Sequence, residues 1–520
     1  MTVKDIQFVR KNQFGIGLTV LFFFFHLLWL TNNGFWTDEF HTYEAARLPI
    51  KELVENRFSA GHLPTYFLLI RYWCLLVGFS EWSMRLPSLI FTTLSFFAFF
   101  LLCNKFLKDN FLFAFTILLF FFHPFVFWAG QEARVYSILM FLSIMSSCLI
   151  LSFIISKRTI YLLFYSVTVL IGMSMHPVFI LQVAVHIIFV FCHHRYTPLT
   201  PLKRGIFLKV FVSIVIPLLI LLPLYLTFLV NQNKFSVDSE MEFIRVGKFL
   251  RKIGFISLGS PSGYYGNHKN LENIIEKIPI PFFAILLISS FIYLIAPSIT
   301  LPLKGGEKGG GPNLTGSDDE KKVFLLKYAF YWMWIPIVLI YIIGTFFYEK
   351  IGSTRYYSPI IPSMILIMSI GFTNLKNVGN GLKPFLTFFK ALFLILLLCI
   401  LLFQMSWKGA GVRESIDYLK ANYKAGDGIV FCREDGTKYA FLFYNIEYMS
   451  RIGIDKKLKD KEAIINKIMD FSKDKKRVWL FLYREERSPI PKLLEDYPQF
   501  FEKFCEKEIF EVTIKGFNRI

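Results

Sequence analysis

Apolar runs close to 20 residues long alternate with short polar loops over most of this chain. A hydrocarbon core about 30 Å thick requires roughly 20 apolar residues of helix to cross it, so each run is a candidate membrane span. The first run covers residues 14–30 and follows Lys4, Arg10 and Lys11. Because no small-residue cleavage site follows, we predict a retained span with its N-terminus in the cytoplasm.

The next run, residues 64–79, is shorter and carries Arg71 near its middle. Counting it as a span would place Lys105 and Lys108 outside and would reverse every later loop. We therefore predict an interfacial helix on the outer surface, within an external loop of residues 31–85. About eleven spans result, the later ones near residues 86–102, 112–128, 136–155, 160–175, 177–192, 210–230, 280–300, 324–347, 357–373 and 385–405.

Two long connections interrupt the spans of this predicted membrane domain, residues 1–405. Residues 231–279 form a second external loop, in which apolar residues at helical spacing and basic residues over 243–253 predict a helix on the membrane surface. Residues 303–323 are glycine-rich and predict a flexible cytoplasmic linker. The glycines do not form a phosphate-binding loop, since no strand precedes them and no Gly-Lys-Ser/Thr follows.

The tail, residues 406–520, has the pattern of a small soluble α/β domain. A helical pattern over 412–422 precedes a strand at 429–432, and a second buried strand is predicted at 478–483 with a lysine-rich amphipathic helix between them. Residues 509–514 alternate as an edge strand would. The predicted topology places this domain outside the membrane, and its charges indicate an ordinary solvated surface.

Composition excludes a series of soluble domains and narrows the chemistry. Of the 520 residues 54% are hydrophobic and only 18% are charged, and the mean hydropathy is +0.49. The net charge of +19 lies mostly in short loops that mark the cytoplasmic side, so we predict no nucleic-acid partner. The seven cysteines show no metal-ligand spacing. The tail holds 19 of the 38 Asp and Glu residues, which leaves the membrane domain poor in carboxylates.

The predicted topology places several polar residues of the membrane domain at its external face. Each alone is typical of a helix end or an interface anchor, but their collection on the side opposite the basic loops indicates an outward-facing site. The candidates are Asp38, Glu39, His62, Glu132, Arg134, Tyr136, His176, Arg355 and Tyr356.

These residue types match one reaction. A carboxylate can act as general base on a hydroxyl acceptor, and guanidinium, imidazole and tyrosine groups can stabilise a departing phosphate. A lipid-phosphate donor would bring its phosphate to this depth with its chain among the spans. Glycosyl transfer from a polyprenyl-phosphate sugar meets these conditions without a cofactor, although a divalent ion is compatible with it. We predict no metal-ligating residues.

The order of motifs resembles the GT-C glycosyltransferases of the dolichyl-phosphate-mannose protein mannosyltransferase and aminoarabinose transferase type. The resemblance covers roughly the first 375 residues, and the tail resembles a small external domain that some members carry. The motifs are Asp38-Glu39, Gly61-His62-Leu63-Pro64-Thr65-Tyr66, Arg85-Leu86-Pro87-Ser88, Glu132-Ala133-Arg134-Val135-Tyr136 and Arg355-Tyr356-Tyr357-Ser358-Pro359-Ile360-Ile361-Pro362.

The resemblance implies a role for each candidate. Asp38 would be the base that deprotonates the acceptor, and Glu39 would position acceptor or donor. His62, Arg355 and Tyr356 would approach the donor phosphate. The remaining candidates would line the cavity: Glu132, Arg134, Tyr136 and His176.

Two departures from the family pattern leave the placement of His62 and the identity of the acceptor open, in that order. Members often have His-Pro-Pro where this chain has His62-Leu63-Pro64, and relatives acting on lipid A or protein often have Asp in the loop that here holds Glu132 and Tyr136.

We therefore expect an inverting glycosyltransferase of the inner (plasma) membrane, with its active site and C-terminal domain extracytoplasmic. Its partners would be the lipid bilayer, a polyprenyl-phosphate sugar and a glycan, lipid or protein acceptor. A transporter or flippase of lipid-linked sugars is the main alternative, and a scaffold that presents the tail is another. A transporter would place charge near the bilayer midplane or show internal repeats, and the sequence shows neither.

Overall fold

The structure is a computed structural model of the chain. It describes residues 3–195, 201–232, 287–288, 318–346, 354–374, 391–392, 394–395, 397–402, 405, 411–432, 434–454, 460–483, 494–509 and 512–520. Several predicted segments lie outside these residues: the surface helix at 243–253, nearly all of the loop 231–279 and of the span 280–300, and residues 303–317 of the linker.

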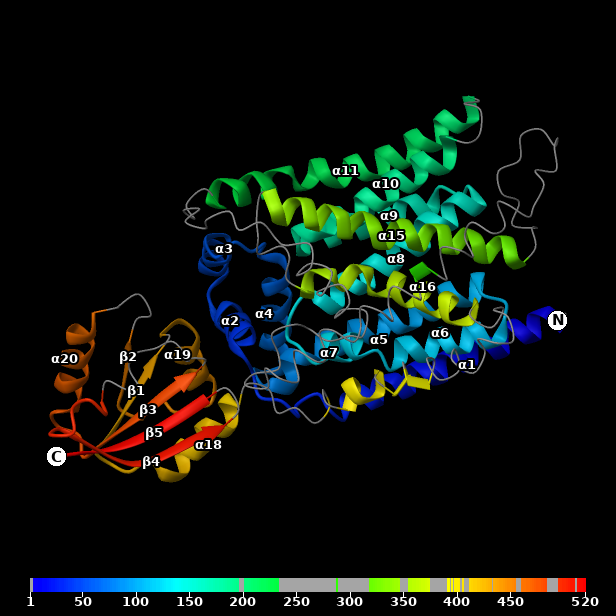
Figure 1. Ribbon diagram of the computed structural model, residues 1–520. Helices are drawn as coiled ribbons and strands as arrows, with labels where there is room; N and C mark the ends of the chain where they lie inside the picture. Colours follow the sequence, from blue (N-terminus) through cyan, green and yellow to red (C-terminus); the bar gives the residue numbers. More distant parts are fainter. Residues whose placement is uncertain are drawn as a thin grey trace.

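Most of the chain forms a bundle of long apolar helices that lie side by side (Figure 1). The bundle, with its short connecting helices α7, η1 and η3, comprises α1 (Val3–Leu27), α5 (Glu81–Phe106), α6 (Asn110–Phe121), α7 (Pro124–Gly130), α8 (Tyr136–Ser156), α9 (Ile160–Met175), η1 (Pro177–Phe179), α10 (Ile180–Arg195), α11 (Pro201–Gln232), α15 (Asp318–Phe346), η3 (Thr354–Ile360) and α16 (Ile361–Asn374). Residues 318–323, at the end of the predicted linker, already belong to helix α15.

The chain has the helices of a multi-pass membrane protein. Among the described residues, four helices are long and apolar enough to cross a membrane, or five if the bent pair α6 and α7 counts as one span. Shorter apolar helices run over Gln13–Leu27, Ile160–Met175 and Pro177–Cys192. The total of about eleven spans stays a prediction, because the structure describes only residues 287–288 of 280–300 and 11 of the 21 residues of 385–405.

One predicted span is broken. The run expected to be continuous over 112–128 forms α6 and α7, which meet at an angle of 46°. Pro124 opens α7 at the break. Proline lacks an N–H and favours the first turn of a helix over its interior, which accounts for the new start at this position.

Three short helices cover the end of the bundle that faces the C-terminal domain, while α1 begins at the opposite end (Figure 1). They are α2 (Thr37–Arg47), α3 (Ile50–Ser59) and α4 (Thr65–Val77). Helix α4 corresponds to the predicted interfacial helix, and its 13 residues are too few to cross a bilayer. Its Arg71 Nη1 donates a hydrogen bond to the Ala46 carbonyl at 3.0 Å, which ties α4 to α2.

The C-terminal domain is a mixed sheet with helices, and its strand order is β2-β1-β3-β5-β4. Strand β1 pairs in parallel with β2 and β3, whereas β5 is antiparallel to β3 and β4. The elements are α18 (Val412–Asn422), β1 (Asp427–Cys432), α19 (Glu434–Phe443), β2 (Arg451–Ile454), α20 (Lys461–Ser472), β3 (Arg477–Tyr483), β4 (Phe501–Ile509) and β5 (Val512–Arg519).

The predicted edge strand at 509–514 is wrong. Ile509 ends β4 and Val512 begins β5, so the alternating pattern spans the ends of two strands. Strand β5 lies between β3 and β4, and its residues are mostly buried. The edge strand on this side of the sheet is β4, whose mostly exposed residues include several Lys and Glu side chains that discourage pairing with another chain.

Candidate active site

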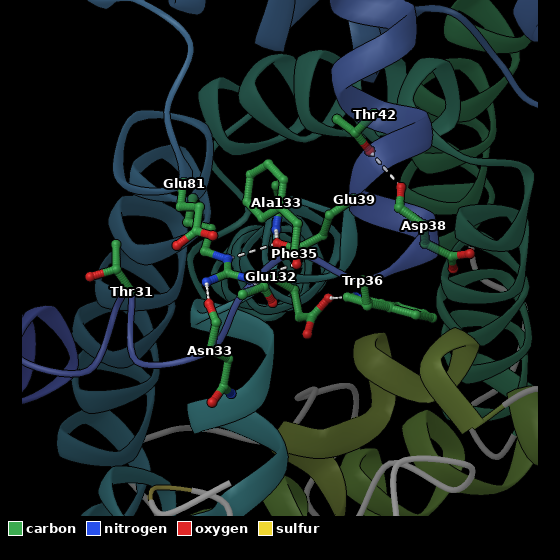
Figure 2. Close-up of polar contacts among 12 residues, drawn as sticks. Thr31, Asn33, Phe35, Trp36, Asp38, Glu39, Thr42, Glu81, Glu132 and Ala133 are labelled. Atoms are coloured by element: carbon green, nitrogen blue, oxygen red, sulfur yellow. Dashed lines mark hydrogen bonds and ion pairs between the residues drawn. The ribbon is translucent and has the colours of Figure 1, made fainter. Parts of the chain in front are cut away.

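Helix α2 begins ten residues after α1 ends and carries both predicted catalytic carboxylates in its first turn. Successive residues of an α-helix point about 100° apart, so Asp38 and Glu39 cannot face the same space. Figure 2 shows the result: Glu39 points toward Ala133, whereas the carboxylate of Asp38 points away from it. The two neighbours therefore have different surroundings.

The carboxylate of Asp38 lies between two arginines. Arg355 Nη1 of η3 donates a hydrogen bond to Asp38 Oδ2, and Arg134 Nη2 lies 3.9 Å from the same oxygen. Arg134 Nη1 also donates to the Asp38 carbonyl at 3.2 Å, which fixes the arginine against α2. The Asp38 side chain is 23% exposed, so the group is accessible. One carboxylate between two guanidinium groups leaves an excess of positive charge.

The arginines determine the protonation of Asp38. Burial alone would raise the pKa of this carboxyl, but the charges of Arg134 and Arg355 and the hydrogen bond from Arg355 outweigh burial and lower the pKa below its usual value. Asp38 is therefore ionised at neutral pH.

Glu39 is fully buried and paired with Arg85 of α5. Arg85 Nε donates to Glu39 Oε1 at 2.7 Å and Nη2 donates to Oε2 at 2.6 Å, while the backbone N–H of Ala133 donates to Oε1 at 2.9 Å. The expected substrate-positioning role of Glu39 does not fit this placement, because both carboxylate oxygens are occupied and its side chain is 0% exposed. Glu39 joins α2 to α5 and to the segment before α8.

Glu132 also forms a hydrogen bond within the protein. Its Oε2 accepts a hydrogen bond from Trp36 Nε1, and the side chain is buried. The guanidinium of Arg355 lies over the Trp36 ring, 5.3 Å from its centroid, an arrangement that favours a cation. Glu132 was expected to line the cavity. In the structure it holds the indole against which Arg355 rests.

The two candidate histidines lie near the arginines. Burial, followed by the charges of Arg134, His176 and Arg57, lowers the pKa of His62 to about 3, so its imidazole is neutral at physiological pH. The rings of His176 and Tyr356 are 5.2 Å apart, and His176 Nδ1 accepts a hydrogen bond from the Val178 N–H at 3.2 Å. His62 is thus a hydrogen-bonding group rather than a cation.

Tyr136 is buried behind the arginines of the site. Its side chain is 1% exposed and stacks on Trp128 with ring centroids 5.4 Å apart. The structure therefore brings Asp38, Arg134 and Arg355 into direct contact and places His62 and His176 beside them. Tyr136 packs behind the site.

The sequence indicated no role for two residues that support the side chains of the candidate site. Trp36 supports Arg355, and Arg85 neutralises Glu39. A signal for Arg85 existed, because an arginine at the start of an apolar span requires a buried partner, and a carboxylate of the preceding loop is the nearest candidate. Trp36 had no comparable signal. It lies under Arg355 only because the fold brings Arg355 to Asp38, which is 317 positions away in sequence.

Within the part of the chain that the structure describes, no three His, Cys, Asp or Glu side chains are arranged to hold a metal ion. The expectation that the site has no resident metal or cofactor stays a prediction.

Comparison with known proteins finds similar structures but no similar sequences. No protein family and no curated protein matches the sequence. The chain is similar to the crystal structures of ArnT from Cupriavidus metallidurans in the apo state and bound to undecaprenyl phosphate, with TM-scores of 0.44 and 0.45. In both cases the identity is 10%, and the alignment covers 97% of this chain and 97% of the ArnT chain.

Proposed function

We propose that the protein is a membrane glycosyltransferase that moves a sugar from a polyprenyl-phosphate donor to a hydroxyl acceptor, with inversion. The observation that carries this proposal is the accessible carboxylate of Asp38 held between Arg134 and Arg355. A base and two anion-binding cations share one site at the end of a bundle of apolar helices. A substrate that combines a lipid chain, a phosphate and a reactive sugar fits all three features.

The excess positive charge supports an anionic donor group. Arg355 presents a planar guanidinium that suits a phosphate, and Tyr356 follows it in the chain. Neutral His62 can add a hydrogen bond without adding charge. In this proposal the polyprenyl chain lies among the helices while its phosphate meets Arg355 and Arg134.

Donor binding would also activate Asp38. A phosphate that engages Arg355 competes with the carboxylate for the same guanidinium, so Asp38 loses an interaction that lowers its pKa and becomes a stronger base. The acceptor oxygen then attacks the anomeric carbon, its proton passes to Asp38, and the bond from that carbon to the phosphate oxygen breaks. Polyprenyl phosphate leaves with the electron pair. A single displacement of this kind inverts the anomeric configuration.

The distribution of basic loops supports an extracytoplasmic site. Lys105 lies in the last turn of α5 and Lys108 lies between α5 and α6, while Lys157 and Arg158 lie between α8 and α9. The N-terminus of α1 is at the end of the bundle opposite the C-terminal domain (Figure 1). Under the rule that short basic loops face the cytoplasm, α2 and the C-terminal domain face outward from the inner membrane.

The test uses purified full-length protein and a panel of polyprenyl-phosphate sugars with a hydroxyl acceptor. We expect one class of donor to be consumed, with release of polyprenyl phosphate and an inverted anomeric product. Lipid-linked sugar that crosses the bilayer of reconstituted vesicles without loss of its sugar would identify a flippase instead. Absence of donor cleavage across the panel, in protein that binds polyprenyl phosphate, would contradict the enzymatic proposal.

A further inference from the structure

The segment that leads into Asp38 is held by two arginines from different parts of the molecule. We call residues 30–36, between α1 and α2, the lead segment. Arg85 of α5 donates to the carbonyls of Leu30, Asn33 and Gly34 at 3.1, 2.6 and 3.2 Å. Arg413 of α18 donates to the carbonyls of Thr31 and Asn32, each at 3.0 Å. Five consecutive carbonyls thus accept hydrogen bonds from one bundle arginine and one arginine of the C-terminal domain.

Glu81 connects the helix that carries Arg85 with Arg413 of the C-terminal domain. It lies in the first turn of α5, one turn before Arg85, and its Oε2 accepts a hydrogen bond from Arg413 Nη1 at 2.7 Å. Tyr444, just after α19, donates its hydroxyl to Glu81 Oε1 and accepts the backbone N–H of Phe35 at 3.2 Å. The C-terminal domain therefore holds both the lead segment and the helix against which it rests.

Close packing accompanies these polar contacts. A Cβ atom at Gly34 would lie 2.8 Å from Cβ of Arg413, so only glycine permits this approach. The Phe35 and Phe443 rings stack with centroids 4.7 Å apart, and Tyr43 of α2 meets Phe443 at 4.9 Å. The hydroxyl of Thr37 donates to that of Tyr483 at 3.1 Å.

Helix α2 depends on such external support. It has only 11 residues, and Trp36 at its N-cap makes no side-chain capping bond. Isolated helices of this length are marginal in water, so packing must determine where α2 begins and where its first turn points. Asp38 lies in that first turn.

We propose that the C-terminal domain positions the catalytic carboxylate, with Arg413 and Tyr444 as positioning residues that hold the lead segment so that Asp38 meets Arg134 and Arg355. This inference rests on the proposed function for the role of Asp38, but the contacts that carry it are independent of the reaction. The domain is then an integral part of the active site without contributing a group that touches substrate.

The test compares three variants in the full-length protein. Arg413→Ala removes the hydrogen bonds to both carbonyls and to Glu81, and Glu81→Gln removes the charge while keeping an acceptor for Tyr444. Lys473→Ala is the matched control, because it removes a cation of the same domain from an ion pair with Asp470 in which both side chains are more than 70% exposed.

The readout is the pH dependence of carbodiimide labelling at Asp38, located by mass spectrometry. The charged and titratable groups that face Asp38 are Arg134, Arg355, His41 and His62, and all remain in each variant. If α2 shifts, the two arginines lower the pKa of Asp38 less, and the labelling midpoint rises by up to about one pH unit. Arg413→Ala and Glu81→Gln should show this rise and a lower kcat with little change in donor KM. Lys473→Ala should match the parent.

A purely structural role would reduce the yield of folded protein without moving the midpoint. Unchanged labelling midpoints in both Arg413→Ala and Glu81→Gln would overturn the inference, whatever the turnover. Raised midpoints in a protein that cleaves no donor would support the positioning of Asp38 and contradict the proposed function instead. Glu81→Gln keeps the test valid if Arg413→Ala does not fold.

Discussion

Asp38 and Glu39 are neighbours in sequence and opposites in environment. Asp38 is partly exposed and lies between two arginines from distant segments, whereas Glu39 is 0% exposed and forms a two-bond pair with Arg85. Glu39 also accepts a backbone N–H, so its charge is fully compensated within the protein. The difference shows that one carboxylate of this motif is available for chemistry and the other holds the site together. Substitutions of the two residues should therefore separate activity from stability.

The largest effect is expected from Asp38→Asn. The amide cannot accept a proton from the acceptor, so transfer should fall by about 10² to 10⁴-fold, the range for general base catalysis. Initial rates with a polyprenyl-phosphate sugar measure this loss. Glu55→Gln, which neutralises an exposed carboxylate on α3, is the control and should keep the parent rate. Transfer by Asp38→Asn at the rate of the control would remove Asp38 as the base.

Glu39→Gln should affect stability first. It leaves the buried guanidinium of Arg85 without its counter-charge, a change that typically costs about 3–5 kcal/mol of unfolding free energy. Thermal unfolding in detergent should show a lower midpoint than for Asp38→Asn. A Glu39→Gln protein as stable as the parent would mean that the pair with Arg85 does not support the site.

Arg355→Gln should change both donor affinity and pH dependence. Loss of a charged hydrogen bond worth about 1.5–3 kcal/mol should raise the donor KM by roughly 10- to 100-fold. The charge of Arg355 helps to lower the pKa of Asp38, so its removal raises that pKa. Since the ionised carboxylate is the active form, activity is lost as pH falls through the pKa, and the acid limb should move to higher pH. Arg355→Lys, which keeps the charge, should move the limb less; an equal shift in both variants would contradict a charge effect.

The smallest effect is expected from Trp36→Phe. Phenylalanine keeps an aromatic ring near Arg355 but removes the N–H that Glu132 accepts. A net hydrogen-bond contribution of about 0.5–1.5 kcal/mol predicts a decrease in kcat/KM of roughly 2- to 10-fold. Trp36→Ala, which also removes the ring, should decrease it further. Equal values for the two variants would show that the ring does not support Arg355.

The sequence predicts the membrane helices well because a physical length determines them. The bilayer imposes runs of about 20 apolar residues; α8 follows its predicted run to within one residue, α5 covers its run but begins five residues earlier, and α15 begins six residues earlier and ends one residue short. Helix α18 has the predicted bounds, residues 412–422, because the spacing of its apolar residues is regular. The prediction of one strand at 509–514 was wrong, because the alternation of polar and apolar residues continues from the end of β4 into the start of β5.

For the candidate site, the sequence indicated which residues lie near one another but not which groups each of them contacts. The scarcity and sidedness of charge, together with the order of the motifs, selected Asp38, Arg134 and Arg355, which the structure places in contact. The same reasoning gave Asp38 and Glu39 a shared catalytic role. Neighbours in sequence point in different directions once they lie in a helix, and the sequence pattern alone did not indicate that. The part played by Arg413 had no local signal, since it depends on how the C-terminal domain meets the lead segment.

The most direct test of this division is single-turnover transfer by Asp38→Asn and Glu39→Gln, measured per folded molecule in the same detergent. We predict that Asp38→Asn is folded and transfers sugar about 10²- to 10⁴-fold more slowly than the parent, whereas the folded fraction of Glu39→Gln transfers it within a few-fold of the parent rate. Full transfer by Asp38→Asn together with loss of transfer by folded Glu39→Gln would contradict the account, because it would make the buried carboxylate the base.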